Sequence, residues 1–226
     1  MAAYLGYDFV DATEWVAFGY DGKLDMEKSQ ANLAAMFGEK SKVVLPGFYG
    51  ALPDGKVRVM SRGGSDITGA LAAAAIDAGV YENWTDVSGI LMADPRIVDN
   101  PRPIAHITYS ELRELSYMGA NVLHEETIFP VRIKDIPINI RNTNDPQAPG
   151  TLIQESFSKE TREERKRFIT GISGRKDFSI LTLRKGHLAA DTGTIRGVLA
   201  IFEKYNVPIE HFPSGIDSFS LVVSTE

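Results

Sequence analysis

Hydrophobic and polar positions alternate along the first half of the chain in a way that predicts strands and helices in turn. The apolar run KVVLPGFYG at 42–50 predicts a buried strand that ends in a glycine-bounded loop. Residues 25–37 predict a helix, and the alanine-rich run ITGALAAAAIDAG predicts a second helix that stops at Gly79. Alternating strands and helices are typical of an α/β domain.

The same alternation continues up to a polar, proline-bearing loop. Residues 80–84 predict a short strand, and the long loop after it is dense in Asp, Gly and Pro. Thr108 and Glu111 have the spacing of a capping box, which predicts the start of a helix. A further helix at about 122–134 and a strand at 136–141 are predicted before the loop NTNDPQAPGT.

A change of pattern after this loop predicts two domains. We expect an α/β domain at 1–153, a polar linker at 154–167 and a smaller α+β domain at 168–226. The helix of the smaller domain is predicted from apolar residues at helical spacing from Ile195 onwards. Its predicted strands are 168–172, 178–183, 207–212 and 218–223. We expect this α+β unit to be incomplete, because a second helix and a closing strand are not predicted.

Composition excludes several classes of function. The formal net charge of −6 and pI near 5.3 leave no broad basic surface for nucleic acid or for anionic lipid. The absence of cysteine excludes disulfides, thiolate metal sites and a cysteine nucleophile. No run approaches the roughly 20 apolar residues of a membrane span, and the first residues lack the features of a signal peptide. A cytoplasmic protein is therefore expected.

The glycine-rich loop SRGGSD is the strongest local indication of ligand binding. Gly63 and Gly64 let the backbone approach a ligand closely, and the following helix presents free N–H groups to an anion. Arg62 can form two hydrogen bonds with a carboxylate or phosphate, and Asp66 can hold an ammonium group or orient a metal. A plain strand-to-helix turn, capped by Ser65 or Asp66, fits the same residues equally well.

The loop TDVSGILMADPR at 85–96 is a candidate nucleotide loop. Thr85, Asp86, Asp94 and Arg96 follow a predicted strand end. That is where α/β sheets place nucleotides. A long surface loop stabilised by Asx turns is the alternative.

Other familiar catalytic and metal-binding patterns are not found. The segment at 38–41, GEKS, has no Gly-Lys pair and therefore is not a Walker A motif. The four histidines, His106, His124, His187 and His211, have no metal-ligand spacing. His124 is a candidate base, although a packed or capping role fits it better. The residues themselves thus predict an anion-binding loop and a candidate nucleotide loop, and they name no substrate.

Five motifs, in family order, resemble the second half of the catalytic domain of aspartate kinases. They are VLPGFYGALPDG, SRGGSDITGALAAAA, ENWTDVSGILMADPRIV, ELRELSYMGANVLHEETIFPVR and IPINIRNTNDPQAPGTLI, within a match from about Leu5 to Ile153. The resemblance implies part of an amino-acid-kinase (carbamate-kinase-like) α/β sandwich. It also implies phosphoryl transfer from Mg-ATP to the β-carboxylate of L-aspartate, the first step of lysine, threonine and methionine biosynthesis. Related kinases of uridylate, glutamate or acetylglutamate share the fold, but are not expected to carry this set of motifs.

The resemblance further implies roles for residues of both loops. Arg62 and Asp66 would bind the carboxylate and amino group of aspartate. The residues that would line this site are Arg62, Gly63, Gly64, Ser65 and Asp66. The residues that would surround ATP are Thr85, Asp86, Leu91, Arg96 and Asn121. Asn121 stands where many family members have a phosphate-facing lysine, and an asparagine cannot neutralise a phosphate. Glu125 likewise replaces a proline that is common in the family.

A Lys-x-Gly-Gly motif, whose lysine stabilises the transferring phosphoryl group in the family, does not occur in this sequence. Loss of such a positioned cation costs orders of magnitude in rate. We therefore expect that the family's N-terminal catalytic segment is missing and that this chain alone is inactive or nearly so. No residue is assigned as catalytic or as a metal ligand.

The C-terminal segment from Phe178 resembles the first ACT domain of aspartate kinases, a ferredoxin-like α+β fold. ACT domains bind end-product amino acids at the first loop and helix start, usually across a dimer interface. The resemblance therefore implies a lysine or threonine effector and a homo-oligomer formed through this domain. The implied effector residues are Asp191, Gly193, Thr194, Ile195, Pro208, Ile209, Glu210 and Ser214. A packing unit without a ligand is the alternative, and the second ACT domain of the family is not found.

Two functions remain open on the sequence. The chain is either a fragment of an aspartate kinase or a non-enzymatic module that binds an amino acid and dimerises. Uncovered strand edges in both domains predict self-association in either case.

Overall fold

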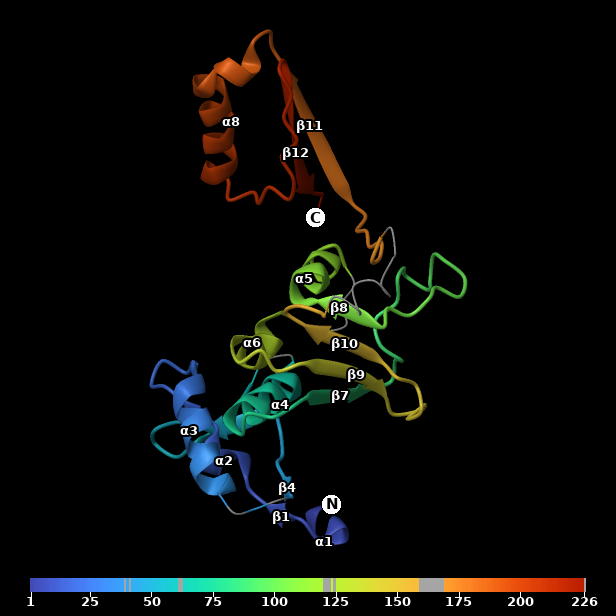
Figure 1. The fold of residues 1–226 in the computed structure, drawn as a ribbon. Helices are drawn as coiled ribbons and strands as arrows, with labels where there is room; N and C mark the ends of the chain where they lie inside the picture. The colour runs from blue at the N-terminus through green and yellow to red at the C-terminus, as the bar shows by residue number, and fades with distance from the viewer. Residues whose placement is uncertain are drawn as a thin grey trace. The chain divides into compact units, whose positions relative to one another are not determined.

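Strands and helices alternate through the first of two units into which the chain divides, Met1–Ser173 and Gly174–Glu226 (Figure 1). The computed structural model describes residues 1–38, 40, 42–60, 63–119, 123, 125–158 and 169–225. The described helices of the first unit are α1 Ala2–Leu5, α2 Ala12–Trp15, α3 Met26–Phe37, α4 Gly64–Ala75, α5 Tyr109–Tyr117 and α6 Glu125–Ile133. Its described strands are β1 Asp8–Phe9, β2 Ala17–Phe18, β3 Leu24–Asp25, β4 Val43–Val44, β5 Tyr49–Ala51, β6 Val57–Val59, β7 Tyr81–Thr85, β8 His106–Thr108, β9 Ile138–Asn142 and β10 Thr151–Gln154.

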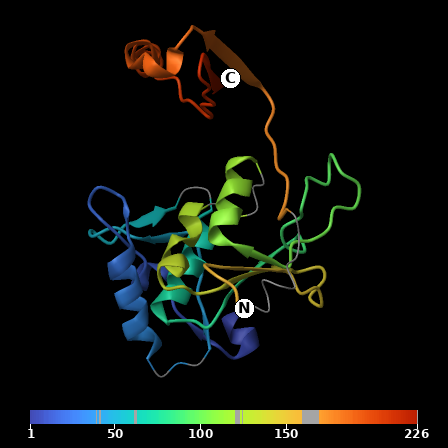
Figure 2. The ribbon, with the colours of Figure 1, turned by 45° about the horizontal axis from the view of Figure 1, so that its top comes forward.

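The sheet that organises the first unit has the strand order β7-β9-β10-β8. Strand β7 runs parallel to β9, with Trp84 opposite Arg141 and Thr85 opposite Asn142. Strand β10 is antiparallel to β9 and parallel to β8. Because β7 and β9 are parallel, their C-terminal ends lie at the same edge of the sheet. The long loop from β7 to β8 starts at that edge and extends away from the sheet (Figure 2).

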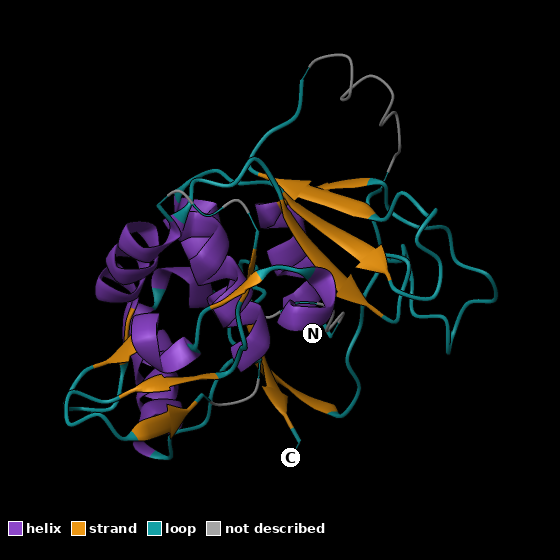
Figure 3. Ribbon diagram, turned by 90° about the horizontal axis from the view of Figure 1, so that it is seen from below, coloured by secondary structure: helices purple, strands orange, loops and turns teal. Residues whose placement is uncertain are grey.

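Helices α4, α5 and α6 pack against one face of this sheet (Figure 3). Ile138, Ile140 and Ile153 are fully buried in that layer. Alternate side chains of a strand point to opposite faces, so one set of β-branched residues faces the helices. Helix α4 lies close to the sheet because its many alanine and glycine residues have small side chains. A Cβ at Gly69 would lie 2.5 Å from the hydroxyl oxygen of Tyr81 on β7.

The N-terminal part of the first unit forms a second small sheet with the order β3-β2-β5-β6. Its core includes Trp15 and Leu33, which pack with Leu71 of α4. The prediction of one continuous strand at 42–50 is wrong, because the segment forms β4, paired with β1, and then β5 in this sheet. Pro46 between them has no N–H to donate to a ladder.

Two helices of the first unit start after a residue whose side chain caps them, and the cap at Thr108 was predicted from the sequence. Helix α3 begins after Asp25, whose carboxylate accepts a hydrogen bond from the Lys28 amide (3.0 Å). Helix α5 begins after Thr108, and the predicted capping box with Glu111 is confirmed. These local signals need no long-range contact, which explains why the sequence pattern locates them.

Residues 169–173 belong to the first unit. The Thr170 hydroxyl donates to the Glu111 carboxylate (2.6 Å), and the Ile172 amide donates to the Met92 carbonyl (2.7 Å). The strand predicted at 168–172 is therefore wrong for residues 169–172, whose backbone contacts a loop instead of a neighbouring strand. Phe168 lies outside the described residues.

The second unit contains an antiparallel pair of strands and one long helix. Its described elements are β11 Phe178–Arg184, the 3-10 helix η1 Leu188–Ala190, α8 Thr192–Lys204 and β12 Ser218–Ser224. Strands β11 and β12 pair over their whole length. Leu188, Phe219 and Leu221 form the core, against which Ile195 and Phe202 of α8 pack.

The strand predicted at 207–212 is reduced to a bridge. The Glu210 amide donates to the Val222 carbonyl, and the Val222 amide donates to the His211 carbonyl (both 2.9 Å). Pro208 has no amide hydrogen, so the segment cannot form a full ladder with β12. Within the described part of the chain, no helix is long and apolar enough to cross a bilayer.

Candidate functional site

The glycine turn before α4 depends on both of its glycines. Gly63 is in the left-handed conformation (φ 81°) and caps the helix. A Cβ at Gly64 would lie 2.6 Å from Cβ of Met60 and 3.1 Å from Cβ of Phe48. Thr68 joins the turn to the loop before β5, because its hydroxyl donates to the Gly64 carbonyl (2.7 Å) and accepts from the Phe48 amide (3.0 Å). The Thr68 hydroxyl thus connects the first turn of α4 to the backbone before β5.

Asp66 lies in the first turn of α4 and contacts strand β7. Its carboxylate accepts a hydrogen bond from the side-chain amide of Asn83 (3.0 Å), and the Tyr81 hydroxyl lies 3.4 Å from its carbonyl oxygen. Burial raises the pKa of the Tyr81 hydroxyl, so this group remains a donor. Asn83 is two residues before Thr85, so this contact links the glycine turn to the start of the loop at 85–96.

Thr85 and Asp86 stand at the edge where β7 and β9 end. The Thr85 carbonyl accepts two hydrogen bonds from Thr143, one from its amide (2.8 Å) and one from its hydroxyl (2.9 Å). The Thr85 hydroxyl lies 3.2 Å from the carboxylate of Asp86, which is exposed. The backbone here is fixed, while the polar side chains remain available to a ligand.

Thr151 of β10 supports the middle of the same loop. Its buried hydroxyl accepts from the Ile90 amide (2.8 Å) and donates to the Ile104 carbonyl (2.6 Å). Gly89 has φ 94°, and a Cβ there would lie 2.3 Å from this hydroxyl oxygen. Leu91 follows and forms a bridge with Pro103.

Arg96 is paired with Asp94 at the exposed end of the loop. The guanidinium donates to both carboxylate oxygens, at 3.0 and 3.1 Å from Nε and at 2.6 Å from Nη2, and the Arg96 amide donates to the same carboxylate at 2.8 Å. These contacts lower the pKa of Asp94 to about 2, chiefly through the guanidinium and then through the amide, and raise that of Arg96. A phosphate that binds Arg96 must therefore compete with the carboxylate of Asp94.

The structure places one part of the predicted substrate site next to the strand that leads into the predicted nucleotide loop. Gly63, Gly64, Ser65 and Asp66 form the start of α4, next to the strand that leads to Thr85. Arg62, Asn121 and His124 lie outside the described residues. Among the residues that are described, no group of three or more His, Asp and Glu side chains could hold a metal ion.

Sequence reasoning missed four residues that hold this site together. Asn83 contacts Asp66 from β7, while Asn142, Thr143 and Thr151 contact the loop at 85–96 from positions that are distant in the sequence. A usable indication was present for Asn142 and Thr143, because polar residues directly after a predicted strand tend to lie at a ligand edge.

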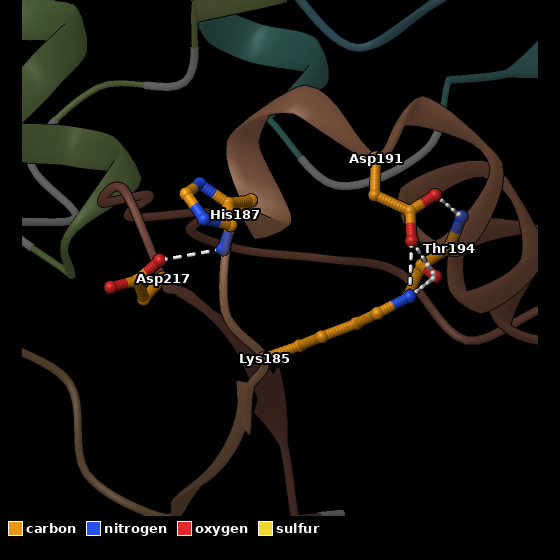
Figure 4. Close-up of polar contacts among 5 residues, drawn as sticks. All are labelled: Lys185, His187, Asp191, Thr194 and Asp217. Atoms are coloured by element: carbon orange, nitrogen blue, oxygen red, sulfur yellow. Dashed lines mark hydrogen bonds and ion pairs between the residues drawn. The ribbon is translucent and has the colours of Figure 1, made fainter.

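A second polar cluster lies at the start of α8 in the second unit (Figure 4). The Asp191 carboxylate caps the helix by accepting from the Thr194 amide (3.0 Å) and hydroxyl (2.7 Å). Lys185, which the sequence analysis did not single out, donates to Asp191 and lies 3.3 Å from the Thr194 hydroxyl. The Lys185 ammonium and then Thr194 hold the pKa of Asp191 well below its usual range.

The other predicted effector residues have varied surroundings. Ile195 and Ile209 pack against the core of the second unit. Glu210 lies 3.6 Å from the Arg175 guanidinium, and Ser214 forms a bridge with Phe219. Gly193 lies within the first turn of α8, and a Cβ there would be 3.4 Å from the Asp191 carboxylate. Pro208 precedes Ile209 in the segment that follows the helix.

Comparison with known proteins identifies the family. The sequence profile of the Amino acid kinase family matches residues 6–142, which is more than half of the chain. The chain belongs to the amino acid kinase family. The expected amino-acid-kinase α/β fold is thereby confirmed.

Several aspartate kinases are among the relatives and solved structures that are similar to this chain. Aspartokinase 3 of Bacillus subtilis (strain 168) is 36% identical over 198 residues, which cover 88% of this chain and 42% of the relative. The crystal structure of Clostridium acetobutylicum aspartate kinase is 48% identical, with a TM-score of 0.81 over 99% of this chain and 50% of that one. Aspartokinase III of E. coli is 28% identical. Its TM-score is 0.69 in a complex with lysine and aspartate, over 96% of this chain and 49% of that one. In a complex with aspartate and ADP the TM-score is 0.66, over 97% and 49%.

The chain spans half or less of the length of these aspartate kinases.

Proposed function

We propose that the first unit provides the ATP side and part of the aspartate site of an aspartate kinase. The observation that carries the proposal is the connection between its two loops. The Asp66 carboxylate accepts a hydrogen bond from Asn83 of β7, and this strand ends at Thr85, at the edge of the sheet where we expect the ligand. The 48% identity with the aspartate kinase of Clostridium acetobutylicum over nearly the whole chain supports this choice within the family.

The proposed reaction transfers the γ-phosphoryl group of Mg-ATP to the β-carboxylate of L-aspartate. Phosphoryl transfer depends on positioning and on neutralisation of charge, which suits a site made of loops and backbone donors. Asp66 would bind the ammonium group of aspartate, with Arg62 on a carboxylate and the amides at 63–65 close to the substrate. The Asn83 amide would keep the Asp66 carboxylate in place.

On the nucleotide side, Thr85, Asp86 and Leu91 would lie along the bound ATP, together with Asn121. Arg96 would exchange the carboxylate of Asp94 for phosphate oxygens, a change that keeps its charge paired. Mg²⁺ would arrive as part of the Mg-ATP substrate, held mainly by phosphate oxygens and water, as is usual for this ion.

The second unit supports a further proposed role, the sensing of an amino acid. Lys185, Asp191 and Thr194 place a cation, a carboxylate and a hydroxyl at one helix start, and these groups suit the two charged ends of an amino acid. We propose that the second unit is an ACT-type domain and that it binds lysine or threonine as its effector. E. coli aspartokinase III has been solved with lysine. A homo-oligomer through this unit is proposed because Ile180 and Ile216 are largely exposed (68% and 76%).

Isothermal titration of this chain with Mg-ATP tests the proposed function. Binding is the readout because the sequence has no Lys-x-Gly-Gly motif. We expect saturable binding with one nucleotide per chain. Asp191→Asn is the matched control, because it changes a carboxylate of the second unit and should leave the affinity for Mg-ATP unchanged.

Separate titrations with L-lysine and L-threonine complete this test. We expect one of the two to bind, and Asp191→Asn to abolish that binding. An amino-acid response without any nucleotide binding at millimolar Mg-ATP would contradict the kinase proposal. It would favour the alternative function, a regulatory module that does not bind ATP.

A further inference from the structure

The last two residues of β9 and the residue that follows them contact the segment that leads into the nucleotide loop. Arg141 and Asn142 lie opposite Trp84 and Thr85 in the parallel register of β9 with β7, and Thr143 comes directly after them. All three residues belong to the motif IPINIRNTNDPQAPGTLI, and their contacts indicate a role for this motif.

Thr143 fixes the first residue of the loop. Its amide and its hydroxyl both donate to the carbonyl of Thr85, at 2.8 and 2.9 Å. Two donors on one carbonyl define the orientation of the peptide plane between Thr85 and Asp86. The direction of the Asp86 amide therefore depends on Thr143.

Asn142 fixes the loop three residues later. Its side-chain nitrogen donates to the hydroxyl of Ser88 (2.7 Å), and its side-chain oxygen accepts from the amide of Asn144 (2.9 Å). Both ends of the amide are thus used, which determines its orientation. The side chain is partly buried, so water competes with these hydrogen bonds less than at an exposed position.

Arg141 joins the ends of the two strands to the loop after β9. Its guanidinium lies 4.8 Å from the ring centre of Trp84 and donates to the Glu82 carboxylate (3.2 Å) and to the Pro146 carbonyl (2.7 Å). Trp84 also donates to Glu82 (3.1 Å). This closed set of contacts holds the sheet edge from which Asn142 and Thr143 reach the nucleotide loop.

We propose that Asn142 and Thr143 are positioning residues for the nucleotide. They act through Ser88 and Thr85, and do not contact the phosphates themselves. The inference rests on the proposed function, because it concerns the same ATP site. A loop that binds phosphates with backbone donors must be held in its bound shape beforehand, since small displacements weaken every contact together. Asn142 and Thr143 supply that rigidity.

Calorimetric titration of Thr143→Val and Thr143→Ser with Mg-ATP tests the role of Thr143. Valine has the same shape but no hydroxyl, and we expect the dissociation constant to rise about tenfold. Serine keeps the hydroxyl, and its affinity should stay within about twofold of the unsubstituted chain. Thr182→Val is the matched control, because it removes the hydroxyl of a β11 threonine that contacts Ser220 in the second unit (2.9 Å). It should not change the affinity for Mg-ATP.

Asn142→Ala provides a second, independent variant and should weaken Mg-ATP binding in the same direction. All titrations are made well below the thermal midpoint of each variant, so a purely structural role would lower the midpoint and leave the affinity unchanged. Unaltered Mg-ATP affinity in both Thr143→Val and Asn142→Ala would overturn the positioning role and leave the proposed function intact. Failure of the unsubstituted chain to bind Mg-ATP would overturn both.

Discussion

Alanine in place of Gly150 is expected to lower the free energy of unfolding of the first unit by more than about 3 kcal/mol, or to prevent its folding. Gly150 has φ 77°, a conformation that alanine adopts only with strain. A Cβ there would also lie 2.0 Å from the carbonyl oxygen of Ile140 in β9. This neighbour is backbone at the centre of the sheet, so the clash cannot be relieved by rotation of a side chain.

Gly55→Ala separates the clash from the backbone strain. Gly55 has φ 82°, but a Cβ there would meet no atom within 4 Å. Its substitution should cost only about 1 kcal/mol, the usual price of a left-handed alanine. Urea unfolding followed by tryptophan fluorescence measures the stability of both variants, since Trp15 and Trp84 lie in the first unit. Equal shifts of the two midpoints would show that the close approach of Gly150 to the Ile140 carbonyl oxygen adds nothing to the backbone strain.

Valine in place of Thr151 is expected to be the next most damaging change, at about 3 kcal/mol. The Thr151 hydroxyl is fully buried and bonds both the Ile90 amide and the Ile104 carbonyl. Valine fills the same volume and leaves both backbone groups without this partner. A buried polar group that loses its partner costs about 1–3 kcal/mol, which is more than the hydrogen bond itself contributes.

Thr151→Ser is the matched control for this prediction. Serine retains the hydroxyl and loses only a buried methyl group, so its cost should be about 1 kcal/mol. Both variants are compared by urea unfolding at the same pH. A serine variant that is as unstable as the valine variant would show that packing of the methyl group, and not the pair of hydrogen bonds, holds the loop.

The elements predicted well from the sequence are those that local chemistry determines. The alanine-rich run after the glycine turn forms α4, although the helix ends at Ala75 and not at the predicted Gly79, and the capping box at Thr108 starts α5 as predicted. The apolar run at 42–50 and the segment at 207–212 were predicted less well. Each contains a proline whose missing N–H interrupts a ladder, and the position of the interruption depends on the partner strand.

In the candidate site, too, the features that local sequence determines were predicted, and those that depend on distant residues were not. The loops at 61–66 and 85–96 are visible in the sequence because Gly, Asp and Arg gather in them. The residues that connect and support them are not visible in this way. Asn83 reaches Asp66 across 17 positions, and Thr143 reaches Thr85 across 58. Such pairs follow from the order and register of the strands β7 and β9, which a single sequence does not specify.

Lys185 in the second unit was missed for a related reason. It follows β11 directly, and the turn through η1 brings the start of α8 back to it (Figure 4). The pattern of apolar residues predicts β11 and α8, but it does not describe the path between them.

We expect Mg-ATP to bind between the start of α4 and the loop after β7, which are linked through Asp66 and Asn83, and ¹⁵N–¹H correlation spectra of the chain during titration with Mg-ATP test this most directly. Amide signals of 63–66, 85–91 and 142–144 are expected to shift and saturate together, while those of 185–194 in the second unit do not move. Shifts confined to the second unit, or an absence of shifts in the loops around Asp66 and Thr85, would contradict it.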